Sequence, residues 1–133
     1  MNEPAANEAT KRWFAEQLER FGAALRFNPA DVLDDLASLE AAFPSPESYK
    51  VALEEAIHQL HVVVRQQPGK GMRGRLNVWR RHAFQSMPAR GGKADLRIVY
   101  KASDGSEVEL LGFGHRHVPR DIYQRLRSRH SPS

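Results

Sequence analysis

The chain has 133 residues, of which 41% are hydrophobic and 27% are charged, and its net charge at pH 7 is +4. This length is typical of a single domain built around one hydrophobic core. The sequence contains no cysteine, which excludes a disulfide framework and a thiolate metal site. No apolar run approaches the length of a membrane span, and the acidic, alanine-rich start differs from a signal peptide. We therefore expect a cytoplasmic protein without membrane association.

The charge is divided unevenly along the chain. Residues 1–56 contain five Lys or Arg and eleven Asp or Glu, whereas residues 57–133 contain fifteen and five. A basic second half of this kind indicates an anionic partner. A solvated basic surface explains the same composition equally well, so the asymmetry alone leaves both interpretations open.

The first predicted element is a helix over residues 8–21, preceded by residues 2–7, which we expect to be frayed. Its apolar face carries Trp13, Phe14, Leu18 and Phe21 at helical spacing. Packing of this helix onto the domain is the simpler interpretation, and a separate interaction helix is the alternative. Residues 22–27 precede the Asn28-Pro29 pair, and on propensity alone they would end the helix.

Two further helices are predicted, over residues 29–43 and 46–67. Each begins with a capping residue followed by proline, Asn28-Pro29 in the first helix and Ser45-Pro46 in the second. Because the connection between them is short, the two helices should pack as an antiparallel hairpin. Their apolar stripes would cover the hydrophobic face of a sheet.

Two patterns in this part of the chain resemble ligand sites without meeting their requirements. His58 and His61 lie three residues apart on a helix, but no third ligand accompanies them, so we expect no metal site. Residues 67–75 form a loop in which glycine is interleaved with Lys70, Arg73 and Arg75. Its spacing matches no nucleotide-binding signature.

The segment from residue 76 to residue 93 is the least regular part of the chain. Residues 76–83, which include Trp79, fit a helix or a strand equally well. We expect a strand over residues 84–88 and a basic turn over residues 89–93.

A β-hairpin over residues 95–113 is the most clearly predicted element. Residues 96–102 are rich in β-branched and aromatic side chains, and Asp104-Gly105 is typical of a type I′ turn. Counting outward from a two-residue turn pairs Leu96 with Phe113 and Arg97 with Gly112. This register places four apolar side chains on the core face, namely Leu96, Ile98, Leu111 and Phe113.

Alternation beyond the hairpin predicts which side chains share a face. Arg116 has the parity of Gly112 and should lie on the same face as Arg97. His115 and His117 should point to the other face unless the strand kinks at a glycine, and the sequence leaves both arrangements open.

The end of the chain is predicted to contain one short helix. Residues 118–120 include a proline and break the strand, and a helix follows over residues 121–129. We expect residues 130–133 to be disordered.

Three segments of the second half resemble the RelE/ParE superfamily of toxins: Leu96-Arg97-Ile98-Val99-Tyr100, Gly114-His115-Arg116-His117 and Asp121-Ile122-Tyr123. They are similar to the carboxyl half of these small basic proteins, which are encoded with antitoxins. The resemblance implies an α+β fold, in which a helical hairpin packs on a three- to four-stranded antiparallel sheet. It also implies a strand at Leu25–Phe27 ahead of the hairpin. Residues 1–22 then form an amino-terminal helical extension, and residues 23–129 form the RelE-like domain.

The resemblance to the RelE-like branch implies a ribosome-dependent mRNA endonuclease. Its partners would be the ribosome, mRNA and a cognate antitoxin, and the reaction would use no metal or cofactor. The neighbouring 2′-OH attacks the scissile phosphate. This step requires a base, an acid and cations that stabilise the added charge.

The resemblance assigns this chemistry to five residues. Arg97 and Arg116 would bind the phosphate, because guanidinium donates two parallel hydrogen bonds and stays charged. Tyr123 would stack on a base or take part in proton transfer. Either His115 or His117 would act as acid or base, since imidazole titrates near neutral pH.

Further cations are expected to hold the RNA on a basic concave face of the sheet, namely Arg73, Arg75, Arg80, Arg81, Arg90 and Lys93. His82 is a weaker candidate for proton transfer. The lysine pair of the best-known RelE-like toxins and the glutamate base of other relatives have no evident match. A ParE-like inhibitor of DNA gyrase and a non-catalytic RNA-binding relative are therefore the alternatives.

Overall fold

The computed structural model describes residues 3–67, 70–71, 79–87, 92–102 and 107–129. Within them, the chain forms four α-helices, a short 3-10 turn over Gly22–Ala24, and five strands. In chain order, the helices and strands are α1 (Glu3–Arg20), β1 (Leu25–Arg26), α2 (Pro29–Ala42), α3 (Pro46–Gln66), β2 (Lys70–Gly71), β3 (Arg80–Phe84), β4 (Leu96–Ala102), β5 (Val108–His115) and α4 (Ile122–Arg127).

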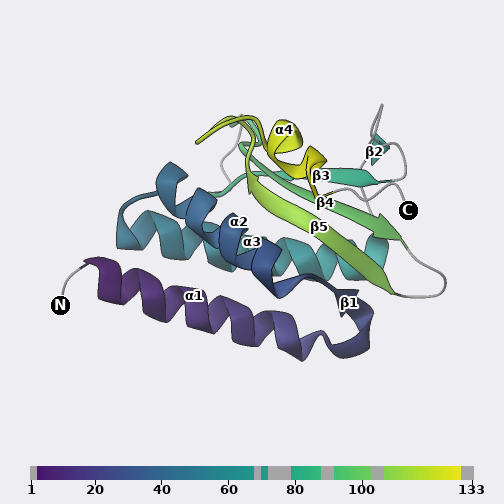
Figure 1. The fold of residues 1–133 in the computed structure, drawn as a ribbon, viewed down its shortest axis with the longest axis horizontal. Coiled ribbons are helices and arrows are strands. Elements are labelled where there is room, and N and C mark those ends of the chain that lie inside the picture. The colour runs from purple at the N-terminus through teal and green to yellow at the C-terminus, as the bar shows by residue number, and fades with distance from the viewer. Residues whose placement is uncertain (1–2, 68–69, 72–78, 88–91, 103–106, 130–133) are drawn as a thin grey trace.

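The strands form one sheet in the order β1-β5-β4-β3-β2. Neighbouring strands are antiparallel except for β1, which runs parallel to β5, and β1 and β2 have two residues each. Helices α1–α3 cover one face of the sheet, and α4 lies on the other face (Figure 1). The predicted α+β class, the helical hairpin on a mainly antiparallel sheet and the additional amino-terminal helix are confirmed. No helix of the described residues has the length and apolar character needed to cross a membrane.

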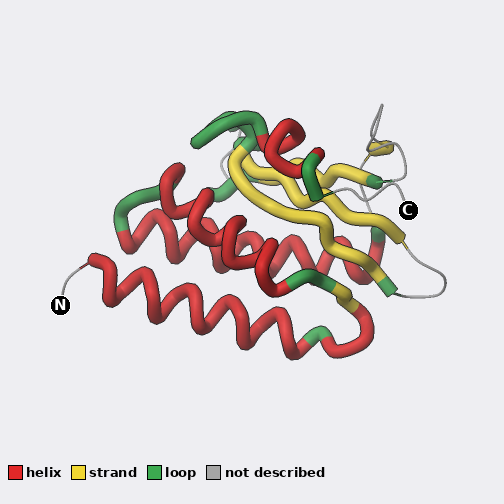
Figure 2. The backbone as a smooth tube through the Cα atoms, viewed as in Figure 1, coloured by secondary structure: helices red, strands yellow, loops and turns green. Residues whose placement is uncertain are grey.

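The starts of α2 and α3 follow the predicted capping chemistry. The Oδ1 atom of Asn28 accepts hydrogen bonds from the backbone N–H groups of Ala30 and Asp31, and Pro29 occupies the first turn. In α3, the hydroxyl of Ser45 accepts a hydrogen bond from the backbone of Ser48 at 3.2 Å. The connection between the helices is short, and α2 runs antiparallel to both α1 and α3 (Figure 2).

Helix α1 begins five residues earlier than predicted, so the expectation that residues 3–7 are frayed is wrong. Asn7 is buried, and its side-chain amide donates a hydrogen bond to Glu40 of α2 at 2.7 Å. Lys11 forms an ion pair with the same carboxylate at 2.8 Å. These contacts with α2 order the first turns of α1, which helical propensity alone does not reveal.

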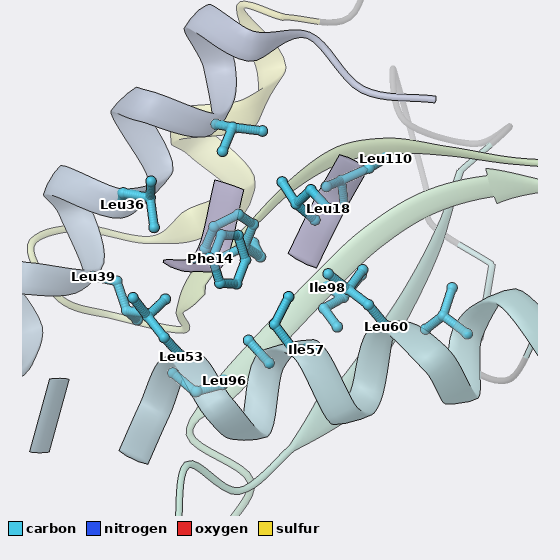
Figure 3. Close-up of a cluster of buried hydrophobic side chains, with 14 of the residues drawn as sticks. Phe14, Leu18, Leu36, Leu39, Leu53, Ile57, Leu60, Leu96, Ile98 and Leu110 are labelled. Atoms are coloured by element: carbon cyan, nitrogen blue, oxygen red, sulfur yellow. The ribbon is translucent and has the colours of Figure 1, made fainter. Parts of the chain in front are cut away.

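The main core lies between the helices α1–α3 and the sheet (Figure 3). The rings of Phe14 and Phe113 are 5.0 Å apart and join α1 directly to β5. The buried hydroxyl of Tyr49 donates to the carbonyl oxygen of Leu36 at 2.7 Å, which links α2 to α3. Leu18 of α1 is also fully buried, so α1 shares the core of the domain rather than lying apart from it. The predicted tail, residues 130–133, and the Asp104-Gly105 turn lie outside the described residues.

The register of the β4–β5 hairpin differs from the prediction. Leu96 pairs with His115 and Arg97 pairs with Gly114, a shift of two residues. One residue of the shift is already present next to the turn, where Ala102 pairs with Val108. The second arises at a β-bulge on β5. Val99 pairs with Gly112 and Tyr100 pairs with Leu110, which leaves Leu111 without a partner on β4.

This β-bulge changes the face to which Leu111 points. Leu96, Ile98 and Phe113 lie in the main core, as predicted. Leu111 instead packs with Trp79, Val99, Ile122 and Leu126 in a second cluster beneath α4. The predicted position of Leu111 on the core face is therefore wrong, because the bulge interrupts the alternation of side chains.

The strand before the hairpin also differs from the prediction. It spans Arg80–Phe84 rather than residues 84–88, and Lys70–Gly71 of the predicted loop pairs with it as β2. Ser86 lies two residues after the end of β3, and its backbone N–H and hydroxyl both donate to the carboxylate of Asp95, at 2.8 and 2.7 Å. This contact joins the segment that follows β3 to the residue that precedes β4. Pro88, the last residue of the predicted strand, lies outside the described residues.

A buried ionic network, here called the Asp35 network, joins α2, β5 and α4. The carboxylate of Asp35 is fully buried and lies 2.6 Å from a guanidinium nitrogen of Arg125 and 2.9 Å from one of Arg129. It also accepts a hydrogen bond from the backbone N–H of Phe113. Burial raises the pKa of Asp35, although the hydrogen bonds and charges of Arg129 and Arg125 act in the opposite direction.

The same two arginines bind the backbone of β5. Arg125 donates to the carbonyl oxygen of Phe113 at 3.0 Å, and Arg129 donates to that of Leu111 at 3.1 Å. Strand β1 pairs with β5 only as far as Glu109, so these backbone groups lie beyond its reach. Side chains from α2 and from the α4 region therefore replace a strand along this part of the β5 edge.

The Asp35 network predicts unequal costs for removing two adjacent carboxylates. Asp35→Ala should lower the free energy of unfolding by about 3–5 kcal/mol, because it leaves two guanidinium groups without their buried partner. Asp34→Ala should cost less than about 1 kcal/mol, since its side chain is 59% exposed. Urea denaturation of both variants measures the difference, and equal losses would contradict the assigned role of Asp35.

Candidate functional site

Cationic side chains from three segments of the chain gather around the ring of Tyr123. The guanidinium carbon of Arg116 lies 4.6 Å from the ring centroid, and that of Arg81 lies 6.0 Å from it. The Nε atom of Arg97 donates a hydrogen bond to the Tyr123 hydroxyl at 3.1 Å. Together with Asp121, these residues are called the Tyr123 cluster below.

The sheet and α4 position this cluster. Arg97 on β4 pairs with Ala83 on β3, two residues beyond Arg81, so both arginines point to the face that carries α4. Gly112 allows α4 to approach, because a Cβ atom there would lie 2.5 Å from a methyl group of Leu126. The expectation that Arg97 and Arg116 share a face agrees with their common contact with Tyr123.

Asp121 is the carboxylate of the cluster. Its Oδ2 atom forms an ion pair with Arg116, and its Oδ1 atom accepts the backbone N–H of Tyr123 at 2.8 Å, which caps α4. Burial acts to raise the pKa of Asp121, but the Arg116 guanidinium and the backbone N–H groups of Tyr123 and Gln124 outweigh it and lower the pKa. Asp121 therefore stays ionised at neutral pH.

The remaining hydrogen bonds of Arg97 orient its guanidinium. Its Nη1 atom donates to the carbonyl oxygens of Ala94 and Leu96 at 2.7 and 3.0 Å, and the side chain is partly buried. Arg97 thus binds neutral groups only, and its charge is not cancelled by an ion pair with any described residue. Three guanidinium groups and one carboxylate give the Tyr123 cluster a net positive charge.

His115 lies on the other face of β5, as alternation predicts in the absence of a kink. Its ring is 5.9 Å from that of Phe43 on the helical side. Its Nδ1 atom accepts the backbone N–H groups of His117 and Val118, at 3.0 and 3.1 Å, which requires that this nitrogen carry no proton. Burial lowers the pKa of His115, and the charges of His117 and Arg97 act in the same direction, against that of Asp95. His115 is thereby held neutral and acts as a turn cap, while His117 is exposed.

The predicted RNA-binding cations divide between different surfaces. Arg81 belongs to the Tyr123 cluster, whereas Arg80 points to the opposite face and donates to the carbonyl oxygen of Gln67 at 2.9 Å. Lys93 is exposed in the segment before β4. Arg73, Arg75 and Arg90 lie outside the described residues.

His82 also lies away from the Tyr123 cluster. Its Nε2 atom is 2.6 Å from the side-chain oxygen of Gln59 on α3, and burial lowers its pKa. His58 is exposed, and the ring of His61 contacts that of Phe21 at 4.5 Å. Within the described part of the chain, no group of three or more His, Asp or Glu side chains could hold a metal ion.

The sequence did not predict that Asp121 belongs to the site. The sequence shows that Asp121 lies two residues before Tyr123. It does not show the ion pair with Arg116, because that contact depends on how the chain turns over residues 116–120. Arg125 and Arg129 were also missed, although they support the site from beneath by holding α4 to β5. Arg125 and Arg129 lie four residues apart in the segment predicted as a helix over residues 121–129, and this spacing could have indicated a shared carboxylate partner.

In the comparisons with known proteins, no family model matches the chain, and neither a curated protein nor a solved structure matches it.

The lowered pKa of His115 predicts acid sensitivity of the fold. The unfolded chain takes up a proton near the ordinary histidine pKa of about 6.5, whereas the folded chain resists protonation to lower pH. The free energy of unfolding should therefore fall as the pH is lowered below about 6.5, and the contribution of His115 is present above that pH.

His115→Asn tests this assignment, because its amide oxygen can replace Nδ1 as acceptor without titrating. The variant should lose less stability than the native protein between neutral and mildly acidic pH in urea denaturation. His58→Asn, at an exposed position, is the matched control. An unchanged pH dependence in His115→Asn would show that His115 does not carry the effect.

Proposed function

We propose that the protein is a RelE-like toxin that cleaves mRNA on the ribosome and is neutralised by a cognate antitoxin. The observation that carries the proposal is the convergence on Tyr123 of Arg81 and Arg116, which approach its ring, and of Arg97, which binds its hydroxyl. The planar guanidinium group matches the geometry and charge of a phosphodiester, and an unpaired base can stack on an aromatic or guanidinium plane. The order of a short strand, a helical hairpin and three antiparallel strands also supports the resemblance to this superfamily.

In the proposed reaction, the 2′-oxygen of the ribose attacks the adjacent phosphorus while the bond from phosphorus to the 5′-oxygen breaks. The products are a 2′,3′-cyclic phosphate and a free 5′-hydroxyl. Arg97 and Arg116 would stabilise the charge that develops on the non-bridging oxygens. Arg81, which has no carboxylate partner among the described residues, would bind a neighbouring phosphate.

Proton transfer requires one group that takes the 2′-hydroxyl proton and one that protonates the 5′-oxygen. The Tyr123 oxygen accepts its hydrogen bond from Arg97, which leaves its own proton free to be donated. His117 is exposed, with its ring 6.4 Å from that of His115, and is the proposed base; this role requires its side chain to turn toward the bound RNA. His115 is unsuited to the role, because its Nδ1 atom is occupied by two backbone donors.

A non-catalytic RNA-binding protein is the second candidate. It is favoured by the positions of the two predicted acid–base groups, since His115 lies on the other face and the ring of His117 is 6.4 Å from that of His115. Binding alone requires only the cationic groups and the aromatic ring, with an affinity that falls as the salt concentration rises.

Translation in a purified system, with mRNA ends mapped by primer extension, separates these candidates. The native protein should produce cuts within codons only when ribosomes are present. Arg97→Ala and Arg116→Ala should each reduce the cleavage rate by about 100-fold, because each removes a preorganised cation from the transition state. Arg127→Ala, an exposed position on α4 with the same change in charge, should cleave at the native rate.

Each other outcome of this assay has a defined meaning. Intact mRNA with arrested translation would exclude the nuclease and favour the RNA-binding candidate. Intact mRNA with normal translation would direct attention to supercoiling by DNA gyrase, the activity that the ParE-like alternative inhibits. Equal loss of cleavage in Arg127→Ala would show that net charge, rather than the Tyr123 cluster, controls activity.

Tyr123→Phe separates the two proposed roles of the tyrosine. It keeps the ring that Arg116 contacts and removes the hydroxyl that Arg97 contacts. Cleavage should fall by about 100-fold or more if the hydroxyl donates a proton, whereas affinity for a non-cleavable 2′-O-methyl RNA should stay within about twofold. Tyr123→Ala should reduce both, and native cleavage by the Phe variant would exclude the hydroxyl from proton transfer.

A further inference from the structure

The ion pair between Arg116 and Asp121 places a carboxylate where the proposed function requires a phosphate. Arg116 is one of the two predicted phosphate ligands, and its side chain is 27% exposed. Its guanidinium nitrogen Nη1 already donates to Oδ2 of Asp121. Carboxylate and phosphate oxygens accept from the same guanidinium donors, so a phosphate that binds through two parallel hydrogen bonds including Nη1 competes with Asp121.

We propose that Asp121 is an internal competitor for the phosphate-binding group of Arg116, and that RNA binding requires the RNA phosphate to replace this carboxylate. The inference rests on the proposed function only in taking the anion to be an RNA phosphate. It makes Asp121 a residue that sets the affinity of the site, rather than one that takes part in bond breaking.

The contacts of Asp121 show how the exchange can occur without loss of structure. The two carboxylate oxygens have separate partners, since Oδ1 caps α4 through the backbone N–H of Tyr123 and Oδ2 faces Arg116. The cap can therefore remain while the contact with Arg116 is exchanged. The backbone of Arg116 is fixed independently, because its N–H donates to the carbonyl oxygen of Asp95 at 2.8 Å.

The surroundings of the pair explain why a carboxylate is useful in the free protein. Arg116 and Arg81 both approach the Tyr123 ring, and Arg97 binds its hydroxyl, so three like charges repel one another at close range. Asp121 offsets part of this repulsion. An RNA phosphate brings its own negative charge and can take over the same task, which is the physical basis of the competition.

Asp121→Asn is the direct test, because the amide oxygen can still cap α4 while the charge opposite Arg116 is lost. The probe is a fluorescein-labelled single-stranded RNA with 2′-O-methyl groups, which cannot be cleaved. Its dissociation constant for Asp121→Asn should be roughly three- to fivefold lower than for Glu19→Gln. Glu19 is exposed on α1, on the helical side of the sheet, and its substitution controls for the change in net charge.

The Arg116→Ala variant tests whether Arg116 is the group for which the two anions compete. In Arg116→Ala, the addition of Asp121→Asn should change the dissociation constant by less than about twofold. Asp121→Ser, whose hydroxyl also caps helices, repeats the test if the Asn variant is unstable by circular dichroism. The inference is overturned if both variants bind no tighter than Glu19→Gln, or if the gain persists without Arg116.

This inference and the proposed function fail in different assays. If the native protein does not cut mRNA but Asp121→Asn binds the RNA more tightly, the nuclease proposal falls and the competition stands. If the native protein cuts mRNA but Asp121→Asn binds no more tightly than the control, only the competition is overturned.

Discussion

The carboxylate of Asp35 is the group on which the placement of α4 depends. It is fully buried and holds Arg125 and Arg129, which in turn bind the backbone of β5. Helix α4 has six residues, too few to be stable in water by itself. Its position, and with it the position of Tyr123, is therefore set by a side chain from the first third of the sequence. The residues of the Tyr123 cluster lie close together, but the contacts that hold them in place involve α2, β5 and α4.

The sequence predicted the class of the fold because its signals were local. Asn28-Pro29 and Ser45-Pro46 define helix starts through their own hydrogen bonds, whichever elements surround them. The register of the hairpin was not predictable in the same way. It depends on a bulge at Leu111, whose carbonyl oxygen accepts a hydrogen bond from Arg129. A rule based on alternation and turn type contains no information about such a contact.

The residues of the candidate site likewise include some that local patterns predicted and some that they did not. The shared face of Arg97 and Arg116 followed from alternation, because the register at Arg97 is shifted by two residues in total and an even shift preserves the alternation. The separation of Arg80 from Arg81 follows from the same period of two, once the strand is known to include both residues. Asp121 was not predicted, because its ion pair with Arg116 is made across a turn, where side chains follow neither the strand nor the helix repeat. Periodic segments were thus predictable, and contacts made through turns or buried charge were not.

The side chains that bind the backbone of β5 at Leu111 and Phe113 also affect how this edge of the sheet can associate with other chains. An exposed strand normally offers a row of backbone donors and acceptors to which a foreign strand can add. At Leu111 and Phe113 this row is already occupied by two guanidinium groups and a carboxylate. Strand addition at that border would have to break buried ionic contacts, which makes it costly. The polar residues that hold α4 in place therefore also act as a barrier to β-augmentation and to edge-to-edge aggregation on this side of the sheet.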